Sequence, residues 1–242
     1  MYLVADAGNT RIKLAVFDGG EMVRLQVYRE WSSSSLAELL RLFPAIDRSL
    51  VCTVSEVPGW LPGLLSSHQV TYQELSHTTP LPIRIGYQTP ETLGCDRIAA
   101  ATGAAGQFPG ANVLAIDAGT ALTMDLVESN GFYPGGTISP GLRMRFSALH
   151  RQTFSLPEIE PVRDVPLIGI NTHDAILAGV VNGMIYEIDN SINSLKNKYN
   201  DLHVILTGGD ALYLSGHLKN TIFVNENLVL NGLNIILRNF SG

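Results

Sequence analysis

Two short stretches of the chain combine the residue types that bind phosphate. Residues 4–10 read VADAGNT and residues 115–123 read AIDAGTALT, so each stretch ends an apolar run with an aspartate and continues with glycine and threonine. Glycine lets the backbone approach an anion, N–H groups and hydroxyls donate hydrogen bonds, and aspartate holds a cation that neutralises phosphate charge. These residue types also favour ordinary hairpin turns. Two matching copies, each after an apolar strand, favour phosphate binding.

A third stretch, LTGGDA at residues 206–211, runs from an apolar strand into Gly208 and Gly209. Such a glycine turn lets adenine and ribose lie against the backbone, although helix starts are often rich in glycine for other reasons. We interpret it as an adenosine-binding turn only in combination with the other two.

The pattern of apolar residues predicts two similar α/β halves. In the first half we expect strands at 2–6, 11–17, 22–28 and 50–55, a hairpin turn at 18–20, and a helix at 35–43 with Ser35 as its cap. In the second half we expect strands ending at Asp117 and Val127, a turn at 129–131, a long helix at 172–196, and a strand before the glycine turn. Glycine and proline cluster at 106–112, which places the boundary between domains 1–108 and 109–242.

Composition bounds the class of protein. The chain has 242 residues, of which 45% are hydrophobic and 16% charged, as in globular proteins. A net charge of −6 offers no extended positive surface for nucleic acid, and neither a basic leader nor a long apolar run predicts export or a membrane span. Cys52 and Cys95 lack metal-site spacing, so we expect neither a zinc site nor a disulfide framework, and a reducing cytoplasm fits best.

Five motifs, in order along nearly the whole chain, resemble those of type III pantothenate kinases, within the superfamily of acetate and sugar kinases, heat-shock proteins and actin. They are Asp6 to Thr10, Tyr87 with Leu93 to Arg97, Asp117 to Thr123, Gly135 to Leu142, and Asn171-Thr172. The resemblance implies an α/β fold of duplicated ribonuclease-H-like (actin-like ATPase) domains. Each would be a mixed five-stranded sheet flanked by helices, with an ATP cleft between them.

The resemblance implies transfer of the γ-phosphoryl group of ATP to pantothenate, the first step of coenzyme A synthesis. Asp96 would be the catalytic base, and Thr172 would reach the neighbouring subunit's site. The implied substrate-binding residues are Tyr87, Gly94, Cys95, Asp96, Arg97 and Thr172. From the residues alone, Asp96 is also suited to cap the alanine-rich helix that follows, Arg97 to form a surface ion pair, and Asn171-Thr172 to begin a helix. Cys95 departs from the alanine or valine expected there, but it is small enough to fit.

The same resemblance assigns the nucleotide and cation contacts. The implied ATP-binding residues are Asp6, Ala7, Gly8, Asn9, Thr10, Arg11, Ile12, Lys13, Gly119, Thr120, Gly208 and Gly209. Mg²⁺ would accompany the phosphates, and Asp117 with Asp6 would bind metal, including a monovalent cation, K⁺ or NH₄⁺. Residues 133–149 would line the substrate side and the seam of a cytoplasmic homodimer. Two alternatives remain: another small-molecule kinase or phosphatase of this superfamily, and a non-catalytic nucleotide-binding regulator.

Overall fold

The computed structural model describes residues 1–239, which form two compact units. The first comprises Met1–Pro109, Gly131–Pro134 and the chain from Asn227, and the second comprises Gly110–Asn130 and Gly135–Glu226. One crossing between the units therefore lies beside the expected boundary at 108/109. The last segment differs from the expectation, because it belongs with the first unit and not with the second.

The first unit is built on a five-stranded mixed sheet with the strand order β3-β2-β1-β4-β5. Its strands are β1 (Tyr2–Ala7), β2 (Ile12–Asp18), β3 (Glu21–Tyr28), β4 (Arg48–Thr53) and β5 (Thr71–Glu74). The first three pair antiparallel, while β4 and β5 extend the sheet in parallel. The predicted meander of three strands is confirmed, with Gly19 at φ 57° in its second turn. Strands β1, β2 and β4 are buried along continuous apolar runs, as expected where helices cover both faces of a sheet, whereas burial alternates along the edge strand β3.

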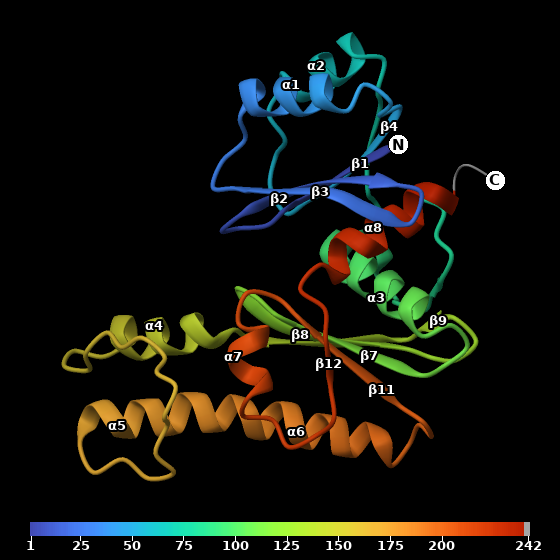
Figure 1. Ribbon diagram of the computed structural model, residues 1–242. Helices are drawn as coiled ribbons and strands as arrows, with labels where there is room; N and C mark the ends of the chain where they lie inside the picture. Colours follow the sequence, from blue (N-terminus) through green and yellow to red (C-terminus); the bar gives the residue numbers. More distant parts are fainter. Residues whose placement is uncertain (240–242) are drawn as a thin grey trace. The chain divides into compact units, whose positions relative to one another are not determined.

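Helices cover both faces of this sheet (Figure 1). They are α1 (Ser33–Leu42), α2 (Leu61–Ser67), α3 (Cys95–Gln107) and α8 (Leu228–Asn239). The core beside α1 and α2 contains Leu3, Leu14, Leu36 and Leu65. The N-cap of α1 is Ser32, whose hydroxyl accepts from the N–H of Ser35, so the expectation that Ser35 itself is the cap is wrong. Helix α8 packs on α3 and on β1, and its buried leucines explain why the C-terminal segment returns to the first unit.

The second unit repeats the sheet, with the order β10-β8-β7-β11-β12. Its strands are β7 (Val113–Ala118), β8 (Ala121–Val127), β10 (Gly135–Pro140), β11 (His203–Thr207) and β12 (Phe223–Val224). As in the first sheet, two antiparallel pairings are followed by two parallel ones. The predicted duplication is therefore confirmed in strand order and in strand direction.

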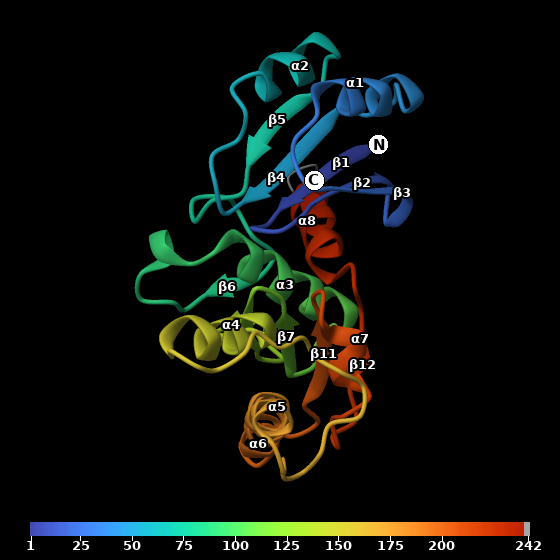
Figure 2. The same cartoon turned by 90° about the vertical axis from the view of Figure 1, so that its left-hand side faces the viewer.

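A long helical rod covers one face of the second sheet. It consists of α5 (Thr172–Leu177), a π-helical segment (Ala178–Asn182) and α6 (Gly183–Lys196), and Figure 2 shows it end-on. Its buried side chains, among them Ile176, Val181 and Ile188, pack against Ile116 and Leu206 of the sheet. The predicted helix at 172–196 is confirmed. The unit also contains α4 (Leu142–Gln152) and α7 (Ala211–Ser215).

Small elements complete the first unit. Strands β6 (Arg84–Ile85) and β9 (Phe132–Tyr133) form a two-stranded parallel sheet, and a 3₁₀ turn spans Pro90–Thr92 before α3.

Within residues 1–239, no helix is both long and apolar enough to cross a bilayer.

The two cysteines form a disulfide, so the expectation that they do not is wrong. Their Cα atoms are 5.6 Å apart, although 43 residues separate them in sequence. The fold brings the carboxyl end of β4 beside the first residue of α3. Sequence spacing carries no information about this approach.

Candidate active site

The first phosphate turn lies between β1 and β2. Asp6 is the penultimate residue of β1, and the N–H of Gly8 donates to the carbonyl of Arg11 at 3.1 Å, which closes the turn. Residues 8–11 are exposed, whereas Ala7 and Ile12 at either side are buried. The two buried residues anchor the strand ends, and the exposed backbone between them is free of covering side chains. The turn is therefore able to receive an anion.

Asp6 is partly buried and its pKa is raised to about 6. Burial is the main cause, because a charged carboxylate loses hydration there. Lys13, its partner in the β1–β2 register, lowers the pKa, while the negative charge of Asp96 raises it. The pKa of Asp6 is thus sensitive to the charge of Asp96, which comes from another element of the first unit.

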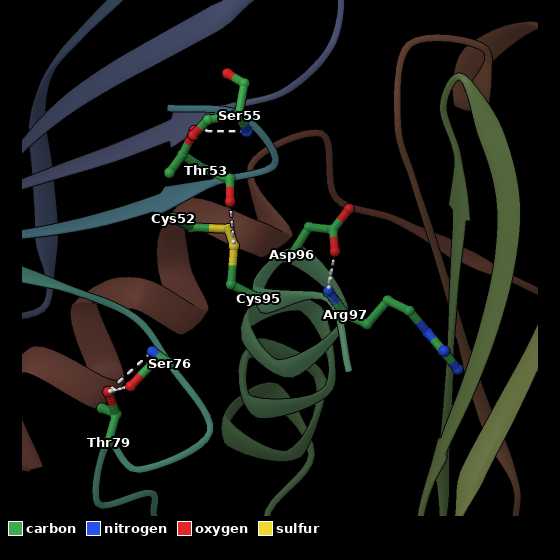
Figure 3. The surroundings of a disulfide bond; sticks show 8 residues. All are labelled: Cys52, Thr53, Ser55, Ser76, Thr79, Cys95, Asp96 and Arg97. Carbon is green, nitrogen blue, oxygen red and sulfur yellow. Dashed lines mark hydrogen bonds between the residues drawn. A yellow bond between two sulfur atoms is a disulfide. The ribbon is translucent and has the colours of Figure 1, made fainter. Parts of the chain in front are cut away.

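Asp96 lies in the first turn of α3, where its Oδ1 accepts from the N–H of Arg97 at 2.8 Å (Figure 3). The N-cap of this helix is Gly94. A Cβ atom at position 94 would lie 2.4 Å from Oδ1 of Asp96, so only glycine leaves room for the carboxylate in this place. The alternative that Asp96 caps this helix is wrong, because Asp96 is the second helical residue, and its side chain remains partly exposed.

Arg97 is buried, with 5% of its surface exposed, so the alternative of a surface ion pair is wrong. Its guanidinium carbon lies 5.6 Å from the centre of the Tyr87 ring, which is a cation–π arrangement. The structure therefore brings together the three side chains singled out around the expected pantothenate motif. Arg97 offers a fixed fork of donors, and Tyr87 offers a ring face and a hydroxyl.

The second phosphate turn is equivalent to the first. Asp117 is the penultimate residue of β7, as Asp6 is of β1, and the N–H of Gly119 donates to the carbonyl of Ala121 at 3.0 Å. Thr120 at the tip is exposed. The late glycine turn meets it, because Gly208 has φ +98° and a Cβ there would lie 2.4 Å from Oδ1 of Asp117. The expected adenosine turn and the second phosphate turn are thus adjacent.

Thr172 is exposed at the start of α5, in the second unit. Asn171 caps this helix, because its Oδ1 accepts from the N–H of Asp174 at 2.9 Å. The predicted helix start is confirmed. A hollow of about 1130 Å³ near Asp174 is lined by residues 163–166 and by Tyr213 and His217, and none of the expected site residues lines it.

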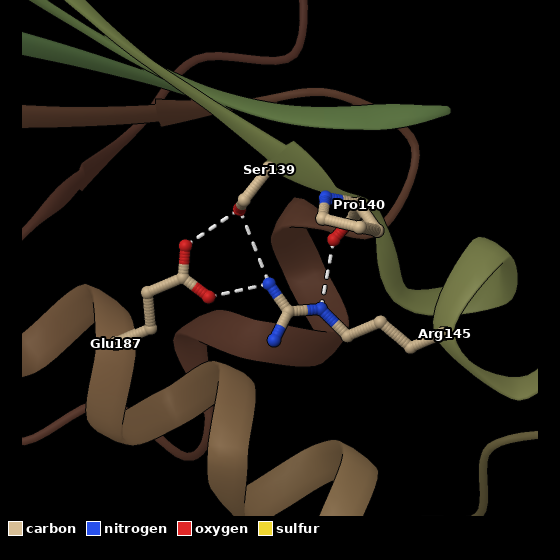
Figure 4. A network of polar contacts seen from close by, with 4 residues as sticks. All are labelled: Ser139, Pro140, Arg145 and Glu187. Atoms are coloured by element: carbon tan, nitrogen blue, oxygen red, sulfur yellow. Dashed lines mark hydrogen bonds and ion pairs between the residues drawn. The ribbon is translucent and has the colours of Figure 1, made fainter.

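A polar network joins three elements of the second unit (Figure 4). Glu187 on α6 accepts from the hydroxyl of Ser139 on β10 at 2.5 Å and from the guanidinium of Arg145 on α4. Arg145 also donates to the carbonyl of Pro140 at 2.8 Å. The network ties the end of β10 and the start of α4 to α6, within the stretch 133–149 that is expected to line the substrate side and the dimer seam.

The carboxylates beside the two turns suit a cation that takes its other ligands from phosphate oxygens and water. Among the described residues, no three His, Cys, Asp or Glu side chains cluster as a self-sufficient metal site. Mg²⁺ in nucleotide sites commonly takes one or two protein carboxylates and completes its shell with substrate oxygens and water. Asp6 and Asp117, each beside an exposed turn, match that pattern.

One residue close to the site was missed by sequence reasoning. Cys52 lies directly opposite Asp6 in the parallel pairing of β1 with β4, and it is bonded to Cys95 beside Asp96. Only the sheet register reveals this neighbour, and no motif in the sequence marks it.

The duplicated sheets and turns define the fold class: ribonuclease-H-like domains of the actin-like ATPase and sugar kinase type. A candidate 2-dehydro-3-deoxygalactonokinase from Sinorhizobium meliloti shares the fold with a TM-score of 0.62 and 14% identity over 99% of both chains. A candidate Baf family transcriptional activator from Campylobacter jejuni aligns with a TM-score of 0.60 and 21% identity over 99% of this chain and 98% of its own. At these identities the likeness concerns the fold alone.

Sequence comparison identifies the family. The family model of type III pantothenate kinase matches residues 2–194. The type III pantothenate kinase of Christiangramia forsetii is 43% identical over 98% of both chains, and that of Bacteroides fragilis strain ATCC 25285 is 43% identical over 100% of this chain and 99% of its own. The chain belongs to the type III pantothenate kinase family. It is an ATP-dependent phosphotransferase that phosphorylates pantothenate in coenzyme A synthesis, and the alternative functions are set aside.

Proposed function

We propose that Asp96 is the base of this reaction, that Tyr87, Gly94, Cys95, Arg97 and Thr172 bind pantothenate, and that both phosphate turns bind ATP. The observation that carries the proposal is the link between the pantothenate motif and the first phosphate turn: Cys95, next to Asp96, is bonded to Cys52, which lies opposite Asp6 in the β1–β4 pairing. Gly208 and Gly209 contact the adenosine in this proposal, because the Gly208 turn lies against Asp117.

Phosphoryl transfer needs positioning and charge neutralisation more than covalent help. The primary hydroxyl of pantothenate attacks the γ-phosphorus, an O–P bond forms, the bond to the β–γ bridging oxygen breaks, and ADP leaves. The carboxylate of Asp96 orients that hydroxyl and accepts its proton. Arg97 pairs with the carboxylate of pantothenate through its fork of donors, and Tyr87 holds Arg97 in place.

Cations complete the proposal. Asp6 holds Mg²⁺ together with the ATP phosphates, and Asp117 holds a monovalent cation, K⁺ or NH₄⁺. These hard cations neutralise the charge that accumulates on phosphate oxygens. We expect Asp117→Asn to weaken the dependence of turnover on K⁺, and an identical K⁺ response would contradict this assignment.

We further propose a cytoplasmic homodimer in which Thr172 serves the neighbouring subunit's site. The second unit exposes large apolar side chains on the elements joined by the polar network, namely Ile138 on β10, Met144 on α4 and Tyr186 on α6. Apolar surface of this kind, near a fixed polar network, is typical of contact surfaces between proteins.

The experiment measures ADP release that depends on pantothenate. Asp96→Asn keeps the shape and hydrogen bonding of the side chain but removes the base, so we expect kcat to fall by about 10²-fold or more. Asp201→Asn is the matched control, because Asp201 is exposed, remote from the motifs, and at φ 52°, which asparagine tolerates. Undiminished kcat in Asp96→Asn would remove Asp96 from the role of base.

A further inference from the structure

The disulfide links residues adjacent to two proposed site carboxylates, Asp6 and Asp96. Cys95 is the first residue of α3 and directly precedes Asp96, while Cys52 lies opposite Asp6 across the β1–β4 pairing. The bond therefore joins the backbone that carries Asp96 to the strand beside the one that carries Asp6 (Figure 3).

The start of α3 meets the sheet at Cys95. Its N-cap, Gly94, has no side chain with which to cap the helix, and the carboxylate of Asp96 accepts from the N–H of Arg97. Beside the disulfide, Sγ of Cys95 lies 3.4 Å from the carbonyl oxygen of Thr53, the last residue of β4. In a dithiol state, that carbonyl can accept only a weak S–H hydrogen bond in place of a covalent tie.

From this geometry we infer that Cys52 and Cys95 are positioning residues whose disulfide holds Asp96 in register with the first phosphate turn, so that their redox state sets kcat. The inference rests on the proposed role of Asp96. Disulfides of cytosolic proteins are commonly transient and redox-sensing, which accords with such a role.

The chemistry is a thiol–disulfide exchange with a dithiol reductant. One thiolate of the reductant attacks Sγ of Cys95, because Cys95 is 9% exposed and Cys52 only 1%. The bond between the two cysteine sulfurs breaks and Cys52 leaves as a thiolate that takes up a proton. The second thiol of the reductant then displaces Cys95, so that two enzyme thiols and one oxidised dithiol result.

The test compares the full-length enzyme in its oxidised and reduced states, with thiols counted under denaturing conditions. We expect no free thiols in the first state and two in the second. On reduction, kcat should fall by about fivefold or more while KM for ATP changes by less than about twofold, and reoxidation should restore kcat. The kcat of Cys52→Ala should equal that of the reduced wild type and should not change when the reductant is added. Cys52→Ser supplies the same comparison if the alanine variant folds poorly.

Two results would overturn the inference: two free thiols that persist after oxidation, or equal kcat in the two states. Equal kcat together with a lower melting temperature on reduction would mark the bond as structural only. Assays of Asp96→Asn in both states separate failure of the redox inference from failure of the proposed role of Asp96. If Asp96→Asn is inactive while the kcat of the wild type is the same with and without reductant, only the redox inference is wrong.

Discussion

At the scale of single residues, the ionised carboxylate of Asp6 lowers the stability of the folded protein. Its pKa is about 6 in the folded protein against an ordinary value of 3.8. Below pH 3.8 the group is protonated in both states. As pH rises from 3.8 to about 6, the unfolded chain loses its proton first, so the free energy of unfolding falls, and above about 6 the loss is complete. A partly buried carboxylate with this effect is typical of a functional site.

Asp6→Asn removes this pH dependence. Between pH 3.8 and 6 the wild type should lose roughly 2 kcal/mol relative to the variant, since one pKa unit corresponds to about 1.4 kcal/mol and the group is not fully buried. Urea unfolding at a series of pH values, with EDTA present to exclude metal ions, measures the difference. Parallel curves for the two proteins would show that Asp6 does not titrate as described.

At the scale of elements, much of the fold was predictable because it follows from local patterns. Apolar stretches bounded by turn residues specified β1, β2 and β3, and helical spacing of apolar residues specified the rod at 172–196. The similarity of the two turns, around Asp6 and Asp117, anticipated the repeated strand order. Each of these features depends on residues close in sequence.

Features that depend on distant pairings were not predictable. Helix α8 joins the first unit because its apolar face packs on α3 and β1, and nothing local tells which sheet it covers. The disulfide arises from the meeting of β4 with α3. In the site, the motifs named Tyr87, Asp96 and Arg97, but the packing of Arg97 on Tyr87 and the place of Cys52 opposite Asp6 required the structure.

Gly94, at the start of α3, has no space for a side chain next to the carboxylate of Asp96. Its backbone angles, φ −56° and ψ 135°, are open to alanine, but the new Cβ would lie 2.4 Å from Oδ1 of Asp96. Gly94→Ala should therefore displace the carboxylate and lower kcat by about tenfold or more, with a small effect on stability. Steady-state kinetics and thermal unfolding provide the two readouts.

Gly63→Ala in α2 is the matched control, since a Cβ there meets nothing within 4 Å. Wild-type kcat in Gly94→Ala, together with wild-type stability, would mean that the position of the Asp96 carboxylate does not matter for turnover.

At the scale of the whole molecule, the proposed homodimer predicts complementation between inactive subunits. If Thr172 serves the neighbouring site, a heterodimer of Asp96→Asn and Thr172→Val chains contains one intact site and one doubly altered site. Co-expressed chains that pair at random should recover about a quarter of wild-type activity, because about half the dimers are mixed and each has one working site. Recovery no greater than the sum of the separate variants would place Thr172 in its own subunit's site.

The central proposal is that both phosphate turns, the one after β1 and the one after β7, bind ATP. Calorimetric titration with Mg²⁺ and ATP tests it most directly, using wild type, Asp6→Asn, Asp117→Asn and the Asp201→Asn control. We predict one ATP per chain and a loss of affinity of about tenfold or more in each of the first two variants, with none in the control. Two ATP molecules per chain, or undiminished affinity in either turn variant, would contradict the account.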